Sequence, residues 1–560
     1  MKKIWLQHYP SGISATVDVN AFASLKDVLR LTCQRFADLP AFSNMGASMT
    51  YAELDLHSRD FAAYLQGTLG LLKGDRVAIM MPSLLQYPVA LFGVLRAGLV
   101  VVNINPQYTA LELERQLKDS GAVAIVVLEN FAHTLQQVLD RHPGLRPTVI
   151  TTEVGDLFPL LKEVVTNVVV KYIKKLVPHW KIVGAIEFNA ALRQGRAHML
   201  KHVPLAHGDM AFLQYTGGTT GVAKGTVLTH GNMVANLQQI SEWLTRDLVD
   251  GKEVLVCPLP LHHIYALTSC LVFMAKGAHT LLITNPRDMP AFIHDLKRYP
   301  PSVIIGVNAL YRALLDTPEF AEVDLRGLKM ANAGGMAVHR AVAERWKKAT
   351  GVPLIEAYGL TEASPGVICN PLDTTDWTGA IGLPFPSTDA TVLDDDAREV
   401  LAGEVGEICV KGPQVMSGYW NRPDETARAF TPDGWLRTGD MGFMDERGYF
   451  RITDRKKDMI IVSGFTVFPS QIEAVVALHP GVAEVAAIGT PDARSGEVVK
   501  IVVVRSDPAL TEQALLAYCR QHLMDCNIPM VVEFRTGSLP KSHLGTILRR
   551  QLRNPASVPA

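Results

Sequence analysis

Helical and strand-like segments alternate along the first part of the chain. Residues 24–37 (SLKDVLRLTCQRFA) carry apolar side chains at the spacing of one helix face, and residues 88–98 (PVALFGVLRAG) are also predicted to be helical. Short apolar runs at 76–82 (RVAIMMP) and 123–128 (VAIVVL) are typical of buried strands. The alternation predicts a layered α/β fold.

A second α/β unit is predicted further along, and the pattern changes again after Pro384. The strands expected in the second unit are 253–260, 278–284, 301–307 and 327–335. A small β-rich subdomain is predicted from short strands with turn signals at 389–400, 406–413 and 448–454. The charged run 454–458 (DRKKD) precedes a tail with strand candidates at 482–489 and 497–504. We therefore predict a large N-terminal domain over residues 1–456 and a smaller α+β domain over residues 457–560.

Composition places the chain among globular proteins without a dominant charge. The 560 residues are 48% hydrophobic, which is enough for several cores, and 54 Lys plus Arg against 55 Asp plus Glu create no field that favours nucleic acid. The seven cysteines are scattered without a C-x-x-C pair, which indicates neither a disulfide framework nor a zinc site and fits a reducing cytosol. The first ten residues lack the apolar core of a secretion signal. We expect a cytoplasmic protein that does not bind nucleic acid.

One segment has a marked amphipathic pattern. In residues 160–177 (LLKEVVTNVVVKYIKKLV) the apolar positions fall on one helical face and the lysines lie elsewhere. Two interpretations stay open: a helix packed on its own domain, or a helix that contacts a membrane surface or a partner chain. Another apolar stretch, 84–102, is broken by Pro88 and Arg96 and is not predicted to span a membrane.

The glycine-rich stretch 215–226 (YTGGTTGVAKGT) has the composition of a phosphate-binding loop. Glycines let backbone N–H groups approach an anion, threonine hydroxyls add donors, and Lys224 adds a positive charge. The stretch is not the Walker pattern, because Ala223 precedes the lysine. On these residues alone, a flexible glycine-rich surface loop is the alternative.

Two acidic residues follow tight turns further along the chain. Glu362 comes after the Tyr-Gly turn of 356–365 (EAYGLTEASP), and a carboxylate is an ordinary magnesium ligand where a triphosphate is bound. Asp440 lies on the glycine turn of 434–442 (GWLRTGDMG), where it suits hydrogen bonds from ribose hydroxyls. Each signal alone is weak, because a solvated glutamate or an Asx turn gives the same pattern.

The order of five motifs is more specific than any one of them. YTGGTTGVAKG, PLHHIYALT, YGLTE, DGWLRTGDMG and ITDRKKDMIIVSGF follow one another along the chain. In this order they resemble the adenylate-forming, or AMP-binding, superfamily of acyl-CoA synthetases, and within it the bacterial long-chain fatty acid CoA ligases. The resemblance extends from the first ten residues to ILRRQLR at 547–553, which is nearly the whole chain.

This resemblance implies a two-step reaction at one site that uses ATP, Mg²⁺ and coenzyme A. The carboxylate of a long-chain fatty acid attacks the α-phosphorus of ATP to give acyl-adenylate and pyrophosphate, and the thiol of CoA then displaces AMP. A mobile C-terminal domain would swing about a hinge at Lys457 between the two steps. Such a motion lets one pocket present two sets of groups and excludes water from the adenylate.

The same resemblance implies roles for particular residues. The phosphate loop would consist of Thr216, Gly217, Gly218, Thr219, Thr220, Gly221 and Lys224. Mg²⁺ would be held by Thr216 and Glu362. The nucleotide would contact Gly334, Gly335, Tyr358, Gly359, Thr361, Asp440 and Arg455. Gly464 would let the pantetheine arm of CoA pass, and His263 would lie beside the acyl carboxylate, with residues 306–311 along the acyl tunnel. A structural histidine in a turn is the alternative for His263.

The chain departs from the family pattern at a catalytic position. Gly545 is followed by Thr546, where the family carries a lysine that reaches the acyl carboxylate and the α-phosphate. Further departures are Ala333 and Ala357 in place of glycines and His262 in place of a tyrosine.

Three hypotheses stay open because of Thr546. The chain is an active long-chain ligase, with slow adenylation or with another lysine such as Lys541 in the missing role. Alternatively, it is a ligase that uses a carrier protein or a different acid, or it is a non-catalytic acyl or adenylate binding protein. Beyond the substrates, the expected partners are the inner face of the cytoplasmic membrane, as a peripheral contact, and a second copy of the chain.

Overall fold

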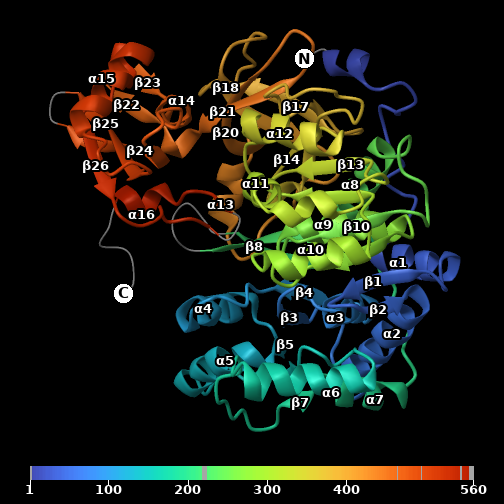
Figure 1. The fold of residues 1–560 in the computed structure, drawn as a ribbon. Coiled ribbons are helices and arrows are strands. Elements are labelled where there is room, and N and C mark those ends of the chain that lie inside the picture. The colour runs from blue at the N-terminus through green and yellow to red at the C-terminus, as the bar shows by residue number, and fades with distance from the viewer. Residues whose placement is uncertain (1–2, 217–222, 463–464, 493–494, 543–544, 554–560) are drawn as a thin grey trace. The chain divides into compact units, whose positions relative to one another are not determined.

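The computed structural model describes residues 3–216, 223–462, 465–492, 495–542 and 545–553 (Figure 1). The chain forms two compact units. The large unit comprises Tyr9–Asp389 and Lys411–Phe430, and the small unit comprises Met1–His8, Ala390–Val410 and Thr431–Ala560. The predicted β-rich subdomain therefore groups with the tail. The predicted boundary between residues 456 and 457 lies where the C-terminal domain is expected to swing about Lys457. That motion stays a prediction.

An eight-stranded sheet forms one layer of the large unit, in the order β19-β9-β8-β4-β3-β5-β6-β7. The run from β8 to β7 is parallel, and β9 and β19 are antiparallel additions at one edge. The strands are β3 (Arg76–Met80), β4 (Val100–Asn103), β5 (Ala124–Leu128), β6 (Thr148–Thr152), β7 (Ile186–Glu187), β8 (Met210–Thr216), β9 (Lys224–Thr229) and β19 (Gly418–Tyr419). The helices that precede β8 in the large unit are α1 (Leu25–Arg35), α2 (Tyr51–Gly67), α3 (Gln86–Arg96), α4 (Ala110–Ser120), α5 (Glu129–Arg141), α6 (Leu160–Val168) and α7 (Phe188–Arg196).

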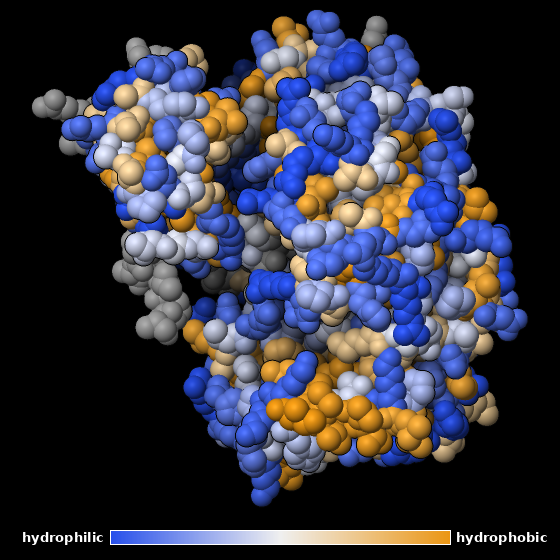
Figure 2. Space-filling model, viewed as in Figure 1, coloured by the Kyte–Doolittle hydropathy of each residue, from blue (hydrophilic) through white to orange (hydrophobic). Residues whose placement is uncertain are grey.

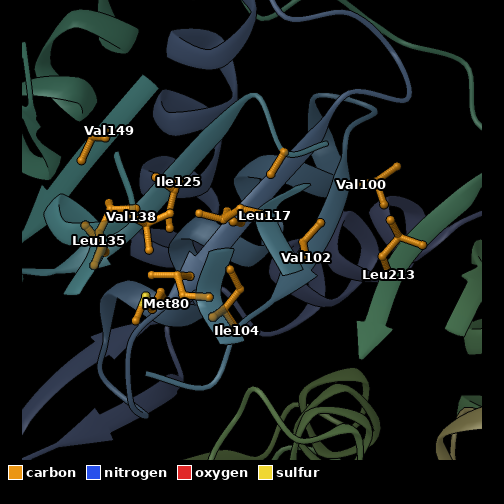
Figure 3. Close-up of a cluster of buried hydrophobic side chains, with 14 residues drawn as sticks. Met80, Val100, Val102, Ile104, Leu117, Ile125, Leu135, Val138, Val149 and Leu213 are labelled. Carbon is orange, nitrogen blue, oxygen red and sulfur yellow. The ribbon is translucent and has the colours of Figure 1, made fainter. Parts of the chain in front are cut away.

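One face of this sheet packs against α4 and α5 (Figure 3). Met80, Val102 and Ile125 from the strands join Leu117 of α4 and Leu135 of α5 in one fully buried cluster. Every residue of β5 is buried. Strands of parallel sheets are covered on both faces, which is why β5 appears in the sequence as a continuous apolar run.

A nine-stranded sheet forms the other layer, in the order β16-β15-β14-β13-β12-β10-β11-β1-β2. Its central strands from β14 to β1 are parallel, and β2, β15 and β16 are antiparallel at the edges. The strands are β1 (Pro40–Asn44), β2 (Ala47–Thr50), β10 (Val254–Cys257), β11 (His279–Leu282), β12 (Val303–Gly306), β13 (Met330–Ala333), β14 (Leu354–Gly359), β15 (Gly366–Cys369) and β16 (Leu383–Pro384). The remaining helices of the large unit are α8 (His230–Trp243), α9 (Ile264–Ala275), α10 (Met289–Arg298), α11 (Asn308–Leu315), η3 (Pro318–Glu322), α12 (Arg340–Thr350), η4 (Thr361–Ala363) and α13 (Pro423–Ala429).

The small unit contains a four-stranded sheet, β17-β18-β20-β21, and a five-stranded sheet in which β23-β22-β25-β24 is extended by β26. The strands are β17 (Asp389–Leu393), β18 (Gly406–Lys411), β20 (Leu436–Met444), β21 (Phe450–Arg455), β22 (Ile460–Val462), β23 (Phe465–Val467), β24 (Val482–Asp492), β25 (Gly496–Arg505) and β26 (Val531–Arg535). The helices are η1 (Ile4–His8), η5 (Lys456–Asp458), α14 (Pro469–Val476), α15 (Glu512–His522), η6 (Asp525–Asn527) and α16 (Arg549–Arg553).

The predicted fold class is confirmed: a mixed α/β chain with a large N-terminal part and a smaller C-terminal part. The prediction of one continuous helix over 160–177 is wrong beyond Val168. There α6 changes into a π-helical turn, η2 (Val169–Ile173), in which the N–H of Lys174 donates to the carbonyl of Val169 at 2.8 Å. The β-branched run 168–170 restricts side-chain rotamers and weakens the α-helix at this point. Within the described ranges, no helix has both the length and the apolar content needed to cross a membrane.

Candidate active site

Loops at the carboxyl ends of four neighbouring parallel strands form the centre of the candidate site. These strands lie in the order β14-β13-β12-β10. His263 follows β10, Gly334 and Gly335 follow β13, and Tyr358 and Gly359 end β14. In open α/β sheets, ligands bind outside the carboxyl ends of the strands. The structure therefore brings together predicted nucleotide and acyl residues that are far apart in the sequence.

Two of these glycines are required by the backbone around them. A Cβ atom at Gly359 would lie 2.2 Å from the carbonyl oxygen of Pro365. Gly335 has a φ of +76°, in the left-handed region that favours glycine. Ala333, one of the departures from the family pattern, is buried at the end of β13.

The predicted phosphate loop connects two antiparallel strands. Thr216 ends β8 and Lys224 begins β9, and these two residues are direct cross-strand partners. The loop residues Gly217, Gly218, Thr219, Thr220 and Gly221 lie outside the described residues. After β9, the hydroxyl of Thr229 caps α8 by accepting a hydrogen bond from the N–H of Asn232 at 3.1 Å. Regular structure therefore fixes the chain on both sides of the loop.

Tyr419 joins this hairpin to the predicted metal ligand. Tyr419 lies in β19, which pairs with β9 and places it opposite Thr226. Its hydroxyl donates a hydrogen bond to the carboxylate of Glu362 at 2.7 Å, and Nζ of Lys224 lies 5.1 Å from the centroid of its ring. Burial and the charge of Glu362 raise the pKa of Tyr419, so the phenol stays protonated and remains a donor. Glu362 and Lys224 thus meet at one side chain that the sequence did not single out.

The donor set around Glu362 fits a cation that arrives with a polyphosphate. Within the parts of the chain that the structure describes, no three or more His, Cys, Asp or Glu side chains are grouped to hold a metal by themselves. Mg²⁺ is usually held by one or two carboxylates together with waters and substrate phosphates. A single carboxylate beside Lys224 matches that chemistry. The residues present therefore fit Mg²⁺ bound with ATP.

A second polar cluster supports the hairpin. One carboxylate oxygen of Asp119 accepts a hydrogen bond from the hydroxyl of Tyr215 at 2.7 Å, and the other accepts one from the guanidinium of Arg422 at 2.9 Å. The indole N–H of Trp420 donates to the backbone oxygen of Asp119 at 3.0 Å. Because Tyr215 precedes Thr216 and Trp420 follows Tyr419, Asp119 holds both strands next to the phosphate loop.

His263 begins α9 as its N-cap. Its Nδ1 accepts a hydrogen bond from the backbone N–H of Tyr265 at 3.3 Å. Burial lowers the pKa of His263 to about 4, so the ring is neutral near pH 7. With Nδ1 as acceptor, the neutral ring carries its proton on Nε2, where it can donate to a substrate oxygen. The predicted acyl role and the structural alternative are therefore compatible.

A buried chain of amides connects the two sheets of the large unit. The side-chain amide of Gln214, on β8, donates to the backbone oxygen of His262 at 2.6 Å. Gln214 in turn accepts a hydrogen bond from Asn103 at 2.9 Å, and Asn103 accepts one from the hydroxyl of Tyr87 at 2.6 Å. The position of the histidine loop is therefore tied to the strand that carries the phosphate loop.

The predicted ribose residues lie in the small unit. Asp440 on β20 and Arg455 on β21 are cross-strand partners, and Nε of Arg455 lies 2.7 Å from a carboxylate oxygen of Asp440. Asp440 is 2% exposed, whereas Arg455 is 55% exposed. Lys457, the predicted hinge, is exposed in η5, and Gly464 lies outside the described residues. The structure thus brings together the two predicted ribose residues, whose role stays a prediction.

Thr546 lies in a tight hairpin of the small unit. The N–H of Ser542 donates to the backbone oxygen of Thr546 at 2.7 Å, and Lys541 pairs with Ile547 across the hairpin. The side chain of Thr546 is exposed. Nζ of Lys541 forms an ion pair with Glu484. The lysine nearest to Thr546 on the opposite strand is therefore engaged with a carboxylate of β24.

Comparison with known proteins assigns the chain to a family. The model described as AMP-binding enzyme matches residues 29–420, and the model described as AMP-binding enzyme C-terminal domain matches residues 471–546. The chain belongs to the AMP-binding enzyme family, as the five motifs predicted.

Full-length relatives and solved structures agree with this assignment. A long-chain-fatty-acid–CoA ligase of Escherichia coli O6:H1 is 54% identical over 99% of this chain and 99% of its own length. A protein of the same description from Haemophilus influenzae is 48% identical over 99% of this chain and 98% of its own length. The crystal structure of ATP-bound MatB from Rhodopseudomonas palustris aligns with a TM-score of 0.81 at 27% identity, covering 95% of this chain and 98% of that chain.

Proposed function

We propose that this chain is a long-chain fatty acid CoA ligase that forms AMP and pyrophosphate. The observation that carries the proposal is the meeting of Lys224 and Glu362 at Tyr419, in a chain whose full-length relatives are long-chain-fatty-acid–CoA ligases. In the first step a fatty carboxylate oxygen bonds to the α-phosphorus of ATP and pyrophosphate leaves. In the second step the CoA sulfur bonds to the acyl carbon, the bond to the AMP oxygen breaks, and the thiol proton is released to a base or to water.

The first step brings a carboxylate and a polyphosphate together, so the site must offset their repulsion. Lys224 and the backbone N–H groups of the loop supply positive potential at the phosphates. When bound by the Glu362 carboxylate and the Thr216 hydroxyl, Mg²⁺ would neutralise further phosphate charge. Tyr419 holds Glu362 in place, and the Nε2–H of His263 orients the acyl carboxylate by donating to it.

The remaining roles belong to the same proposal. The adenine side of the nucleotide pocket is lined by Tyr358, Gly334, Gly335, Gly359 and Thr361. Asp440 and Arg455 bind the ribose, and Lys457 is the hinge of the C-terminal domain. Gly464, which lies outside the described residues, has the role of the glycine that lets the pantetheine arm pass. The thioester product would supply fatty acid degradation by β-oxidation.

We also propose that the protein works in the cytoplasm, at the inner face of the membrane, where its substrate is dissolved in lipid. A homodimer stays a prediction. The second candidate function, a binding protein without adenylation activity, is favoured by Thr546 in place of a lysine.

One assay separates these functions. Purified protein is incubated with ATP, Mg²⁺, CoA and fatty acids of increasing chain length, and AMP, pyrophosphate and thioester are quantified. Stoichiometric AMP and thioester with long-chain acids support the proposal. Adenylate without thioester points to another acceptor, and binding of ATP and acid without pyrophosphate release points to the non-catalytic alternative.

A further inference from the structure

The helix α6 and the turn η2 expose their apolar side chains instead of burying them. No residue of either element is buried. The α6 face, as we call it, consists of Leu160, Leu161, Val164, Val165, Val168 and Ile173. Their exposures range from 44% for Val168 to 85% for Leu161. Figure 2 shows this region as a hydrophobic patch over α6.

Polar contacts attach the same segment to the body of the large unit. The side-chain oxygen of Asn167 accepts a hydrogen bond from the N–H of Gly155 at 2.8 Å. Nζ of Lys171 lies 2.9 Å from the carboxylate of Glu129 and 3.2 Å from that of Glu153. The helix therefore packs with its polar side inward. This is the reverse of the ordinary arrangement, in which an amphipathic helix buries its apolar stripe.

We propose that the α6 face docks on an anionic lipid bilayer. The charges around the face fit this partner. Residues 160–183 contain five lysines and a single acidic residue, Glu163. Lys174 and Lys175 follow Ile173 directly in the chain and are exposed, and Lys181 is exposed six residues further on. An apolar strip bordered by lysines is the pattern of helices that lie in the plane of a bilayer interface and bind acidic headgroups.

A second copy of the chain fits this face less well. In a two-fold symmetric dimer the same patch meets itself, so two lysine-rich segments of the same net charge would face each other. Like charges at a contact oppose association. The nine residues of α6 also cannot cross a bilayer at 1.5 Å per residue, so the helix lies along the surface.

A long-chain fatty acid and its thioester partition into lipid, so docking on a bilayer would deepen the proposed function. The reason for such docking rests on that function, whereas the docking itself does not. Two exposed residues of the face give the main variant, Leu161→Glu with Val165→Glu. Its matched control is Leu72→Glu with Met199→Glu, two apolar residues of the large unit that are 73% and 89% exposed. The charge variant is Lys174→Gln with Lys175→Gln, and its control is Lys252→Gln with Lys348→Gln, two exposed lysines elsewhere.

The measurement is co-sedimentation of the full chain with phosphatidylcholine vesicles that contain or lack roughly one third phosphatidylglycerol, at low and high salt. We expect the wild type to bind the anionic vesicles. Loss of two lysines should weaken binding about 30-fold at low salt, since each contributes about fivefold. Glutamates at positions 161 and 165 should weaken it at least about 100-fold. Both controls should bind as the wild type does.

Three results would overturn the proposal. They are the absence of wild-type binding, equal binding to neutral and anionic vesicles, and unchanged binding of the Leu161→Glu, Val165→Glu protein. A wild-type dimer that this variant converts into a monomer in solution would assign the face to a second copy instead. Adenylation of a soluble medium-chain acid, measured without vesicles, reports on the proposed function separately and should be equal in all five proteins.

Discussion

Tyr419→Phe tests whether the phosphate hairpin and Glu362 act as one unit. The change removes the hydroxyl that donates to Glu362 at 2.7 Å and keeps the ring that lies 5.1 Å from Nζ of Lys224. A hydrogen bond to a charged group contributes about 1.5–3 kcal/mol when it is buried. Because both Tyr419 and Glu362 are partly exposed, we take the lower value, about 1.5 kcal/mol, which is roughly a tenfold effect.

This loss should appear in the first half-reaction. Pyrophosphate release from ATP and fatty acid should slow by about tenfold, and the Mg²⁺ concentration for half-maximal rate should rise, since Glu362 is no longer oriented. Thioester formation from preformed acyl-adenylate and CoA should be nearly unchanged. Glu362→Gln removes the charge altogether, so its effect on the Mg²⁺ dependence should be larger and only partly restored by excess Mg²⁺.

Tyr215→Phe is the matched control. The hydroxyl of Tyr215 also donates to a carboxylate at 2.7 Å and lies on the same hairpin, but its partner is Asp119. This variant should lose about the same 1.5 kcal/mol of stability, without a change in the Mg²⁺ dependence, because Asp119 is not a predicted metal ligand. If Tyr419→Phe adenylates at the wild-type rate with the wild-type Mg²⁺ dependence, or if the two variants behave alike, Tyr419 does not position a metal ligand.

Four further substitutions test the phosphate loop, the missing lysine and a buried histidine. Lys224→Ala should weaken ATP binding, measured by calorimetry, without unfolding the protein, and equal affinity would refute its assignment to the phosphates. Thr546→Lys should accelerate pyrophosphate release by up to about 100-fold while thioester formation from the preformed adenylate stays the same. If neither Thr546→Lys nor Lys541→Ala changes the rate of the first step, the missing charge is supplied elsewhere. Burial lowers the pKa of His230 to about 4, so the unfolded chain binds the extra proton first as the pH falls. The contribution of the neutral His230 ring to the free energy of unfolding is therefore complete above about pH 6.5 and is lost toward pH 4. In His230→Gln, the free energy of unfolding measured in urea should decline less steeply over that pH range than in the wild type.

The sequence predicted the elements whose signals are local. The runs at 123–128 and 301–307 correspond to β5 and β12, because strands covered on both faces are apolar at every position. Thr216 and Lys224 were predicted on the two sides of one loop, and the structure makes them cross-strand partners. In these cases the residues that interact are close in the sequence, so a short motif contains the information.

Other features depend on contacts between distant segments. Tyr419 belongs to β19, which is two residues long and has no periodic pattern of its own. Its place beside Glu362 arises from pairing with β9, which local sequence does not specify. Likewise, the pattern at 160–177 identifies an apolar helix face but not what covers it. The structure shows that the polar side of α6 faces the body, because Lys171 finds Glu129 and Glu153 there.

The two halves of the candidate site belong to different sheets, and polar contacts join them. Lys224 starts β9 of the eight-stranded sheet, whereas Glu362 and His263 follow strands of the nine-stranded sheet. The hydrogen bonds from Tyr419 to Glu362 and from Gln214 to the backbone oxygen of His262 connect the sheets close to the predicted phosphates and acyl carboxylate. Both sheets bury many apolar side chains, so loss of one such bond should change the alignment of the reacting groups more than the free energy of unfolding. Substitutions at these links should therefore lower the adenylation rate in proteins that remain folded.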